Sequence, residues 1–133
     1  MKKIIIIMIV SIICMGYASA ETLTVNVENV DVNKGPVLVG LYGSKESFPN
    51  ENGSFRNAKA ESTAKTVTLS FPDLPKGTYV VAIFQDKNNN GVMDKILGIP
   101  SEKYGFSGNT MMPDWDKNSF EFNADMAVTV KLR

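Results

Sequence analysis

The sequence predicts an all-β fold: a single antiparallel β-sandwich of about seven short strands with long loops. Three observations support this prediction. Several segments alternate apolar and polar residues, two others are apolar on both faces, and turn-forming residues separate them at short intervals. We find no internal repeat and no interdomain linker, so residues 21–133 are expected to form one domain.

The expected strands fall into three pairs along the chain. The segments 22–27 and 66–71 alternate strictly, which is typical of strands with one buried face. The segments 37–43 and 78–86 are apolar on both faces, as central strands are. Two short strands at 119–122 and 126–132 complete the chain.

Three of the connections between these strands are informative. The segment 72–77 is expected to be tight, because it contains Pro and Gly. The segments 44–65 and 96–118 are expected to be long loops. In the first of them, Phe48 and Phe55 are the expected apolar anchors.

Residues 1–20 resemble a secretory signal peptide. Lys2 and Lys3 precede an apolar run, and Ala18-Ser19-Ala20 is a small-residue cleavage site. A membrane anchor is the alternative, but a spanning helix needs about 20 apolar residues and this run is shorter. Cleavage would leave Glu21 as the new N-terminus. We therefore expect an exported protein, most readily a periplasmic one, with secretion or outer-membrane association as alternatives.

Composition excludes several functions for residues 21–133. The chain has no His, and its single cysteine, Cys14, lies in the predicted signal peptide. Triads that need His or Cys, and zinc sites built from them, are therefore excluded. Without Lys2 and Lys3 the chain has twelve basic residues against fourteen acidic ones, which gives no electrostatic reason to bind nucleic acid. The chemistry that remains is that of oxygen ligands.

The stretch DKNNNGVMD at 86–94 has the spacing of a calcium loop. Calcium prefers six to eight oxygen ligands, and such loops supply them from alternate positions around a Gly. Gly91 occupies the position of that Gly. The expected ligands are Asp86, Asn88, Asn90, the carbonyl of Val92, and Asp94.

The stretch is not an EF-hand. Leu97 stands where an EF-hand has its bidentate Glu, and the flanking segments are not helical. Glu102 is the nearest downstream carboxylate and the expected additional ligand, whereas Asp114 and Asp116 are more remote. With so few carboxylates, the dissociation constant is expected to be about 10⁻⁴–10⁻³ M. The alternative is a metal-free turn, because Asn, Asp and Gly also favour tight turns.

Two resemblances add to these inferences. The stretch LPKGTYVVAIFQD resembles the immunoglobulin-like and transthyretin-like sandwiches of exported bacterial proteins. The series of Gly77, Tyr79, the stretch 86–94 and GIPSEKYGFS at 98–107 resembles the domain of unknown function 2141 family, over nearly all of residues 23–132. This resemblance implies a signal peptide and a β-sandwich, comes with no established activity, and favours the calcium interpretation.

Three hypotheses about function remain. The first is a non-catalytic binding or structural module with a calcium loop, whose partner is an envelope protein, a polysaccharide or a small ligand. Tyr104, Phe106 and Trp115 could form its aromatic ligand patch, or could instead attach a long loop to the sandwich. The second is a structural envelope protein without metal. The third is a hydrolase with two carboxylates across a cleft, but nothing in the spacing requires one. We expect a monomer without catalytic residues.

Overall fold

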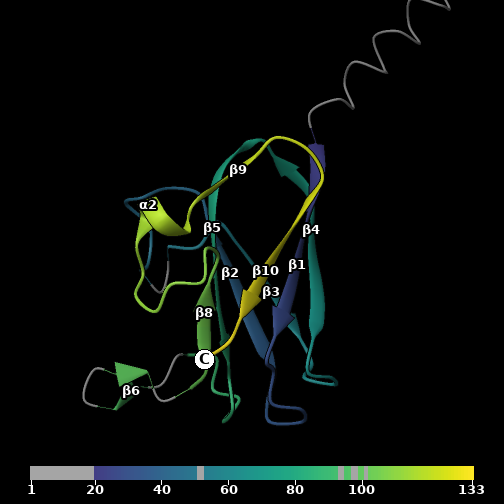
Figure 1. The fold of residues 1–133 in the computed structure, drawn as a ribbon, viewed down its shortest axis with the longest axis vertical. Helices are drawn as coiled ribbons and strands as arrows, with labels where there is room; N and C mark the ends of the chain where they lie inside the picture. Colours follow the sequence, from purple (N-terminus) through teal and green to yellow (C-terminus); the bar gives the residue numbers. More distant parts are fainter. Residues whose placement is uncertain (1–19, 51–52, 93–94, 97–98, 101) are drawn as a thin grey trace, which may run out of the picture.

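The computed structural model describes residues 20–50, 53–92, 95–96, 99–100 and 102–133. Its strands form two main sheets and one small hairpin (Figure 1), which confirms the predicted β-sandwich. The elements are β1 (Ala20–Glu28), β2 (Val37–Tyr42), β3 (Arg56–Ala60), β4 (Val67–Pro75), β5 (Gly77–Gln85), β6 (Lys95–Ile96), β7 (Ile99–Pro100), β8 (Tyr104–Phe106), α2 (Trp115–Asn118), β9 (Phe120–Phe122) and β10 (Met126–Lys131).

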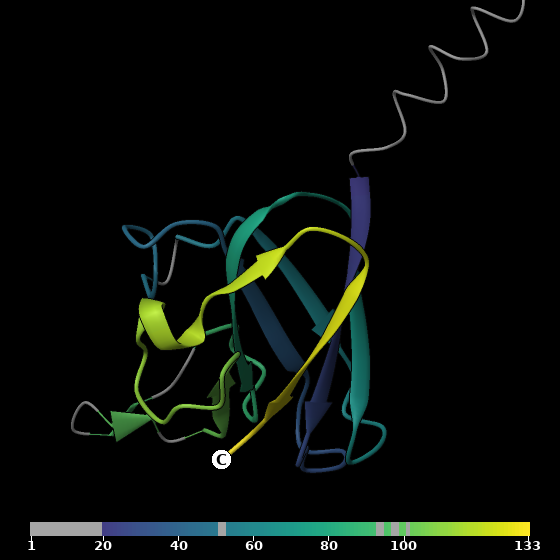
Figure 2. The same cartoon turned by 45° about the horizontal axis from the view of Figure 1, so that its top comes forward.

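The first sheet has the order β10-β1-β4. β1 is antiparallel to β4 and parallel to β10, so Leu23 lies opposite both Phe71 and Met126. The prediction of a wholly antiparallel sandwich was therefore wrong for this pair. After β9 the chain crosses from the other sheet to β1, and it then runs beside β1 in the same direction (Figure 2).

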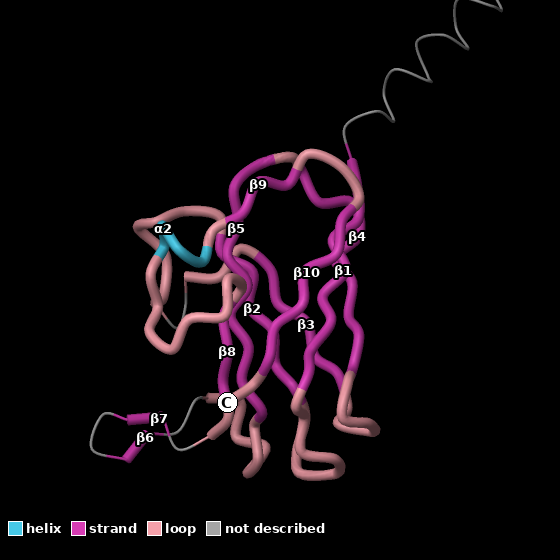
Figure 3. Tube along the Cα trace, in the orientation of Figure 1, coloured by secondary structure: helices cyan, strands magenta, loops and turns pink. Residues whose placement is uncertain are grey.

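The second sheet has the order β3-β2-β5-β8, and β9 also pairs with β5. β8 and β9 use different stretches of β5: Phe106 lies opposite Ala82, and Phe122 lies opposite Gly77. The two-residue strands β6 and β7 form a hairpin that lies beside this sheet (Figure 3). β5 is thus the central strand of the sheet, as its apolar sequence predicts.

The core lies between the two sheets. Alternation places Leu23, Val25 and Val27 of β1 on the inner face, where all three are fully buried. The inner faces of the other strands of both sheets add Val37, Val39, Leu41, Val67, Leu69, Phe71, Tyr79, Val81, Ile83, Phe122 and Val130. These side chains form one continuous cluster, which fixes the ends of the strands and therefore the loops that leave them.

The predicted loop boundaries needed three corrections. β4 continues to Pro75, so only Lys76 separates it from β5, and the Tyr79 hydroxyl donates to the Pro75 carbonyl oxygen across this corner (2.7 Å). The loop predicted at 44–65 contains β3, whose inward side chains Ala58 and Ala60 are too small to produce a clear apolar pattern. The loop predicted at 96–118 contains β8 and α2.

A second apolar cluster covers the outer face of the second sheet. Phe48 is 7% exposed and packs edge-on against Tyr42, with ring centroids 5.2 Å apart. It is therefore the anchor that the sequence predicts. Phe55 is 54% exposed, so the same prediction was wrong for Phe55. Its backbone N–H donates to the Leu41 carbonyl oxygen (2.6 Å), and its ring lies at the edge of the core, 6.1 Å from that of Tyr79 between centroids.

Candidate functional site

The candidate site lies where β5 ends, at the end of the sandwich that also holds the turn between β1 and β2 (Figure 1). Asp86 follows β5 directly and is 1% exposed. Its backbone N–H donates to the carbonyl oxygen of Pro36 in that neighbouring turn (2.8 Å). The start of the predicted calcium loop is therefore fixed by the turn before β2.

The chain after Asp86 folds back over the Asp86 carboxylate. Its Oδ1 accepts the backbone N–H of Asn90 (3.2 Å), and its Oδ2 accepts the backbone N–H of Gly91 (2.7 Å). Two residues make this return possible, because Asn89 and Gly91 have positive φ angles of 56° and 81°. A carboxylate thus lies buried at the centre of a loop that the sequence predicts to bind a cation.

The other predicted ligands of this loop that the structure describes lie nearer the solvent. The side chains of Asn88 and Asn90 are exposed, and the Asn90 Oδ1 accepts the backbone N–H of Val92 (3.1 Å). Val92 has a side chain that is 50% exposed. Asp94 lies outside the described residues.

Glu102 lies against the start of the loop, although it is remote in sequence. It is 6% exposed, and its Oε2 accepts the backbone N–H of Lys87 (2.7 Å). The pairing of β5 with β8 explains this position, because Gln85 donates its N–H to the Lys103 carbonyl oxygen (2.9 Å). The structure therefore brings together Asp86 and the additional carboxylate that the sequence suggested.

The other acidic residues that were considered lie elsewhere. Asp114 is the N-cap of α2, and its Oδ1 accepts the backbone N–H of Asp116 (3.0 Å). α2 lies beyond the far end of β8 from Glu102 (Figure 1). In the part of the chain that the structure describes, no group of three or more His, Cys, Asp or Glu side chains lies close enough together to hold a metal ion.

An ion-pair network borders the loop, and no motif in the sequence indicates it. The Asp31 carboxylate contacts the Nζ of Lys87 (3.1 Å) and the Nζ of Lys103 (2.8 Å). Hydrogen bonds from Lys103 and Lys87 hold the pKa of the Asp31 carboxyl below its ordinary value. These contacts join residues more than fifty positions apart, so no local motif could have revealed them.

The fully buried side chain of Gln85 fixes the backbone beneath this network. Its Oε1 accepts the N–H of Asp31 (2.9 Å), and its Nε2 donates to the carbonyl oxygens of Asp31 (2.7 Å) and Gly35 (3.0 Å). Gly35 has a φ angle of 100°, and a Cβ there would lie 2.2 Å from the Asp86 carbonyl oxygen. Only glycine permits the two turns to approach this closely.

The aromatic residues proposed as a ligand patch pack against one another and the sheet. Phe106 lies 5.8 Å from Phe48 and 5.8 Å from Tyr104 between ring centroids, and Trp115 lies 6.4 Å from Phe48. The Tyr104 hydroxyl donates to the Met111 carbonyl oxygen (2.8 Å). These contacts attach two loops to the outer face of the second sheet, which is the structural alternative that the sequence left open.

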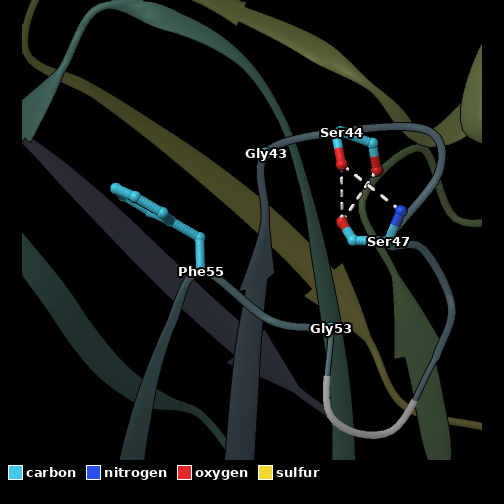
Figure 4. A pocket seen from close by; sticks show the side chains of 5 residues that line it. All are labelled: Gly43, Ser44, Ser47, Gly53 and Phe55. Carbon is cyan, nitrogen blue, oxygen red and sulfur yellow. Dashed lines mark hydrogen bonds between the residues drawn. The ribbon is translucent and has the colours of Figure 1, made fainter.

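An open hollow of about 290 Å³ lies beside the loop after β2. Gly43, Ser44, Ser47, Gly53 and Phe55 line it (Figure 4). The hydroxyls of Ser44 and Ser47 are hydrogen-bonded to each other rather than directed at the exposed ring of Phe55 (2.9 Å). None of the described residues that line this hollow is acidic.

Comparison with known proteins gives one match. A family model described as "Uncharacterized protein conserved in bacteria (DUF2141)" matches residues 25–131, which is most of the chain. No curated protein and no solved structure matches the chain. Among the described residues, no helix is long and apolar enough to cross a membrane.

Proposed function

The chain belongs to the bacterial family DUF2141, which is uncharacterized. From this premise we propose that the protein is an exported, non-catalytic binding or structural module with a calcium loop at residues 86–94. The observation that supports this proposal most is that two buried carboxylates accept backbone N–H groups of the same loop, Glu102 from Lys87 and Asp86 from Asn90 and Gly91. Asp86 is 1% exposed and Glu102 is 6% exposed. Burying a carboxylate is costly unless a partner stabilises its charge, and a bound cation is one such partner.

The hydrogen bonds of Asp86 are compatible with a bound cation. A carboxylate offers about four lone-pair positions. Two of the lone-pair positions of Asp86 accept the backbone N–H groups of Asn90 and Gly91. The remaining lone pairs suit a hard cation such as calcium. Asn88, Asn90, the Val92 carbonyl, Asp94 and Glu102 are the other proposed ligands.

The proposed affinity is weak. Few carboxylates contribute, and Leu97 occupies the place of the bidentate Glu of an EF-hand. We expect a dissociation constant of about 10⁻⁴–10⁻³ M, the range of extracellular calcium modules. Such an affinity fits an exported protein, and we propose the periplasm as its compartment. The cation would stiffen the loop, which would then present a binding surface to an envelope protein, a polysaccharide or a small ligand.

A metal-free turn is the second candidate, and one observation favours it. The loop is already closed by the hydrogen bonds from Asn90 and Gly91 to Asp86, as it would be in a turn capped by an aspartate. The two candidates differ in one measurable respect. A capped turn does not respond to calcium, whereas a calcium loop is stabilised by it.

Thermal unfolding of residues 21–133 in calcium and in chelator separates these candidates. At about 100 times the dissociation constant, calcium should add about 2.7 kcal/mol to the free energy of unfolding. That gain corresponds to a rise of several degrees in Tm. Magnesium at the same concentration should produce a smaller rise, because it demands a tighter octahedral site.

Three variants complete the test. Asp86→Asn and Asn88→Ala should lower or abolish the calcium-dependent rise, and Asn88→Ala is less disruptive because its side chain is exposed. Asp73→Asn is the matched control, since Asp73 is an exposed residue near the opposite end of the sandwich, where β1 begins. Identical melting curves of the unmodified chain in calcium and in chelator would reject the calcium loop and leave a capped turn.

A further inference from the structure

Each of the two buried carboxylates of the proposed loop is followed by a lysine. Lys87 follows Asp86, and Lys103 follows Glu102. Both ammonium groups contact the Asp31 carboxylate, at 3.1 Å from Oδ2 and 2.8 Å from Oδ1. One acidic side chain therefore holds the two cationic groups that lie next to the proposed ligands in sequence.

The position of Asp31 is fixed by the sandwich and not by the lysines. The buried Gln85 side chain bonds both the N–H and the carbonyl oxygen of Asp31. Lys103 has a second fixed acceptor, the carbonyl oxygen of Asn29 (3.2 Å). Because Gln85 also immediately precedes Asp86, a single residue connects the proposed cation loop to the ion-pair network.

We propose that Asp31 sets the cation affinity of the loop without being a ligand. It holds Lys87 and Lys103 away from Asp86 and Glu102, and its negative charge offsets one of their two positive charges. This inference rests on the proposed calcium loop. It extends that proposal by adding Asp31, a residue outside the 86–94 motif, to the residues that determine the affinity for the cation.

The physical reason is electrostatic. An unpaired ammonium group near the loop repels a divalent cation, and it also competes with that cation for carboxylate oxygens. If Asp31 lost its charge, Lys87 and Lys103 would lose the carboxylate that they contact. The acidic residues next to them in sequence are Asp86 and Glu102, which are the proposed ligands. As a general scale, a unit charge about 10 Å from a divalent ion in a largely aqueous surrounding changes its affinity by about three- to tenfold.

The test measures the dissociation constant for calcium alone in the unmodified chain and in Asp31→Asn. The amide resonance of Gly91 reports binding directly, because its N–H donates to the Asp86 carboxylate. We expect Asp31→Asn to weaken binding by about three- to tenfold at low salt. The difference should shrink at about 1 M salt, where the Debye length falls to about 3 Å.

Two controls show whether the effect is local. Asp73→Asn makes the same charge change near the opposite end of the sandwich and should leave the affinity unchanged. Adding Lys103→Met to Asp31→Asn removes one released ammonium group while keeping an unbranched apolar side chain, and should restore most of the lost affinity. Rescue by this double variant separates an electrostatic role from a merely structural one.

The outcomes are distinguishable. If the unmodified chain shows no calcium-dependent shift of Gly91, the proposed function fails and this inference fails with it. If the unmodified chain binds calcium and Asp31→Asn binds equally tightly, the calcium loop stands and the role of Asp31 is overturned. A loss of affinity that Lys103→Met does not restore would also overturn the electrostatic role.

Discussion

Two loops that leave the second sheet are built around a buried polar side chain, and the two side chains differ in charge. At the end of β5, Asp86 is 1% exposed. After β8, the chain to α2 surrounds Asn118, which is also 1% exposed. Asn118 donates to the Ser107 carbonyl oxygen (2.7 Å) and the Thr110 hydroxyl (2.8 Å), and it accepts the N–H of Asp114 (2.7 Å).

This difference predicts which of the two loops is stable without a bound cation. A neutral amide whose donors and acceptor all have protein partners needs nothing further. Ser107 strengthens this network, since its hydroxyl accepts the N–H of Val81 (3.0 Å) and donates to the Asn118 carbonyl oxygen (2.6 Å). Among the described residues, the buried Asp86 carboxylate accepts only backbone N–H groups and forms no ion pair. The loop at Asn118 should therefore be indifferent to cations, whereas the loop at Asp86 should depend on them.

The largest expected effect is that of Asn118→Ala. This change leaves several buried donors and acceptors unsatisfied, so the free energy of unfolding should fall by about 3 kcal/mol. Urea unfolding measures it, and the loss should be the same in calcium and in chelator. The exposed Asn123→Ala is the control and should change stability by less than about 0.5 kcal/mol. A calcium-dependent loss for Asn118→Ala would contradict the distinction between the two loops.

An intermediate effect is expected for Gly35→Ala. The new Cβ would lie 2.2 Å from the Asp86 carbonyl oxygen at a φ angle of 100°, so we expect a loss of about 2 kcal/mol together with a smaller calcium response. Gly91→Ala is the matched comparison, because its φ angle is 81° but no atom lies within 4 Å of the new Cβ. It should cost only about 1 kcal/mol, the penalty of the left-handed conformation. Equal losses in the two variants would show that the close approach at Gly35 is unimportant.

The smallest effect is that of Asp31→Asn on stability in the absence of calcium. The folded-state pKa of Asp31 is lowered, so its contribution is present above the unfolded-state pKa and is lost as pH falls through the folded-state pKa. Solvent screens this partly exposed network, so the loss at about pH 7 should stay below about 1 kcal/mol. Unfolding curves of both chains should converge in strong acid. A difference that persists there would indicate a role other than charge.

Alternation and apolar runs were sufficient to predict most of the fold. Leu23, Val25 and Val27 are buried as their spacing predicts, because a strand with one covered face must alternate. Two features escaped prediction for different reasons. β3 packs only two partly buried alanines against the core, and the parallel pairing of β1 with β10 depends on how the chain crosses between sheets, which no local pattern encodes.

The candidate site was predictable only in part. Spacing identified Asp86 and suggested Glu102, which the pairing of β5 with β8 brings to one turn. Asp31, Gln85, Ser107 and Asn118 were missed, because each acts through contacts with residues distant in sequence. Phe55 was wrongly expected to be buried, since apolar character alone does not show which aromatic residue of a loop faces the core.

The most direct test of the calcium loop is a crystal structure of residues 21–133 grown in several millimolar calcium. Our account predicts a calcium ion with an Asp86 carboxylate oxygen at about 2.3–2.6 Å, and further oxygen ligands from Asn88, Asn90 and the Val92 carbonyl. A structure in which the Asp86 oxygens bond only to the N–H groups of Asn90 and Gly91 and to water, at saturating calcium, would contradict it.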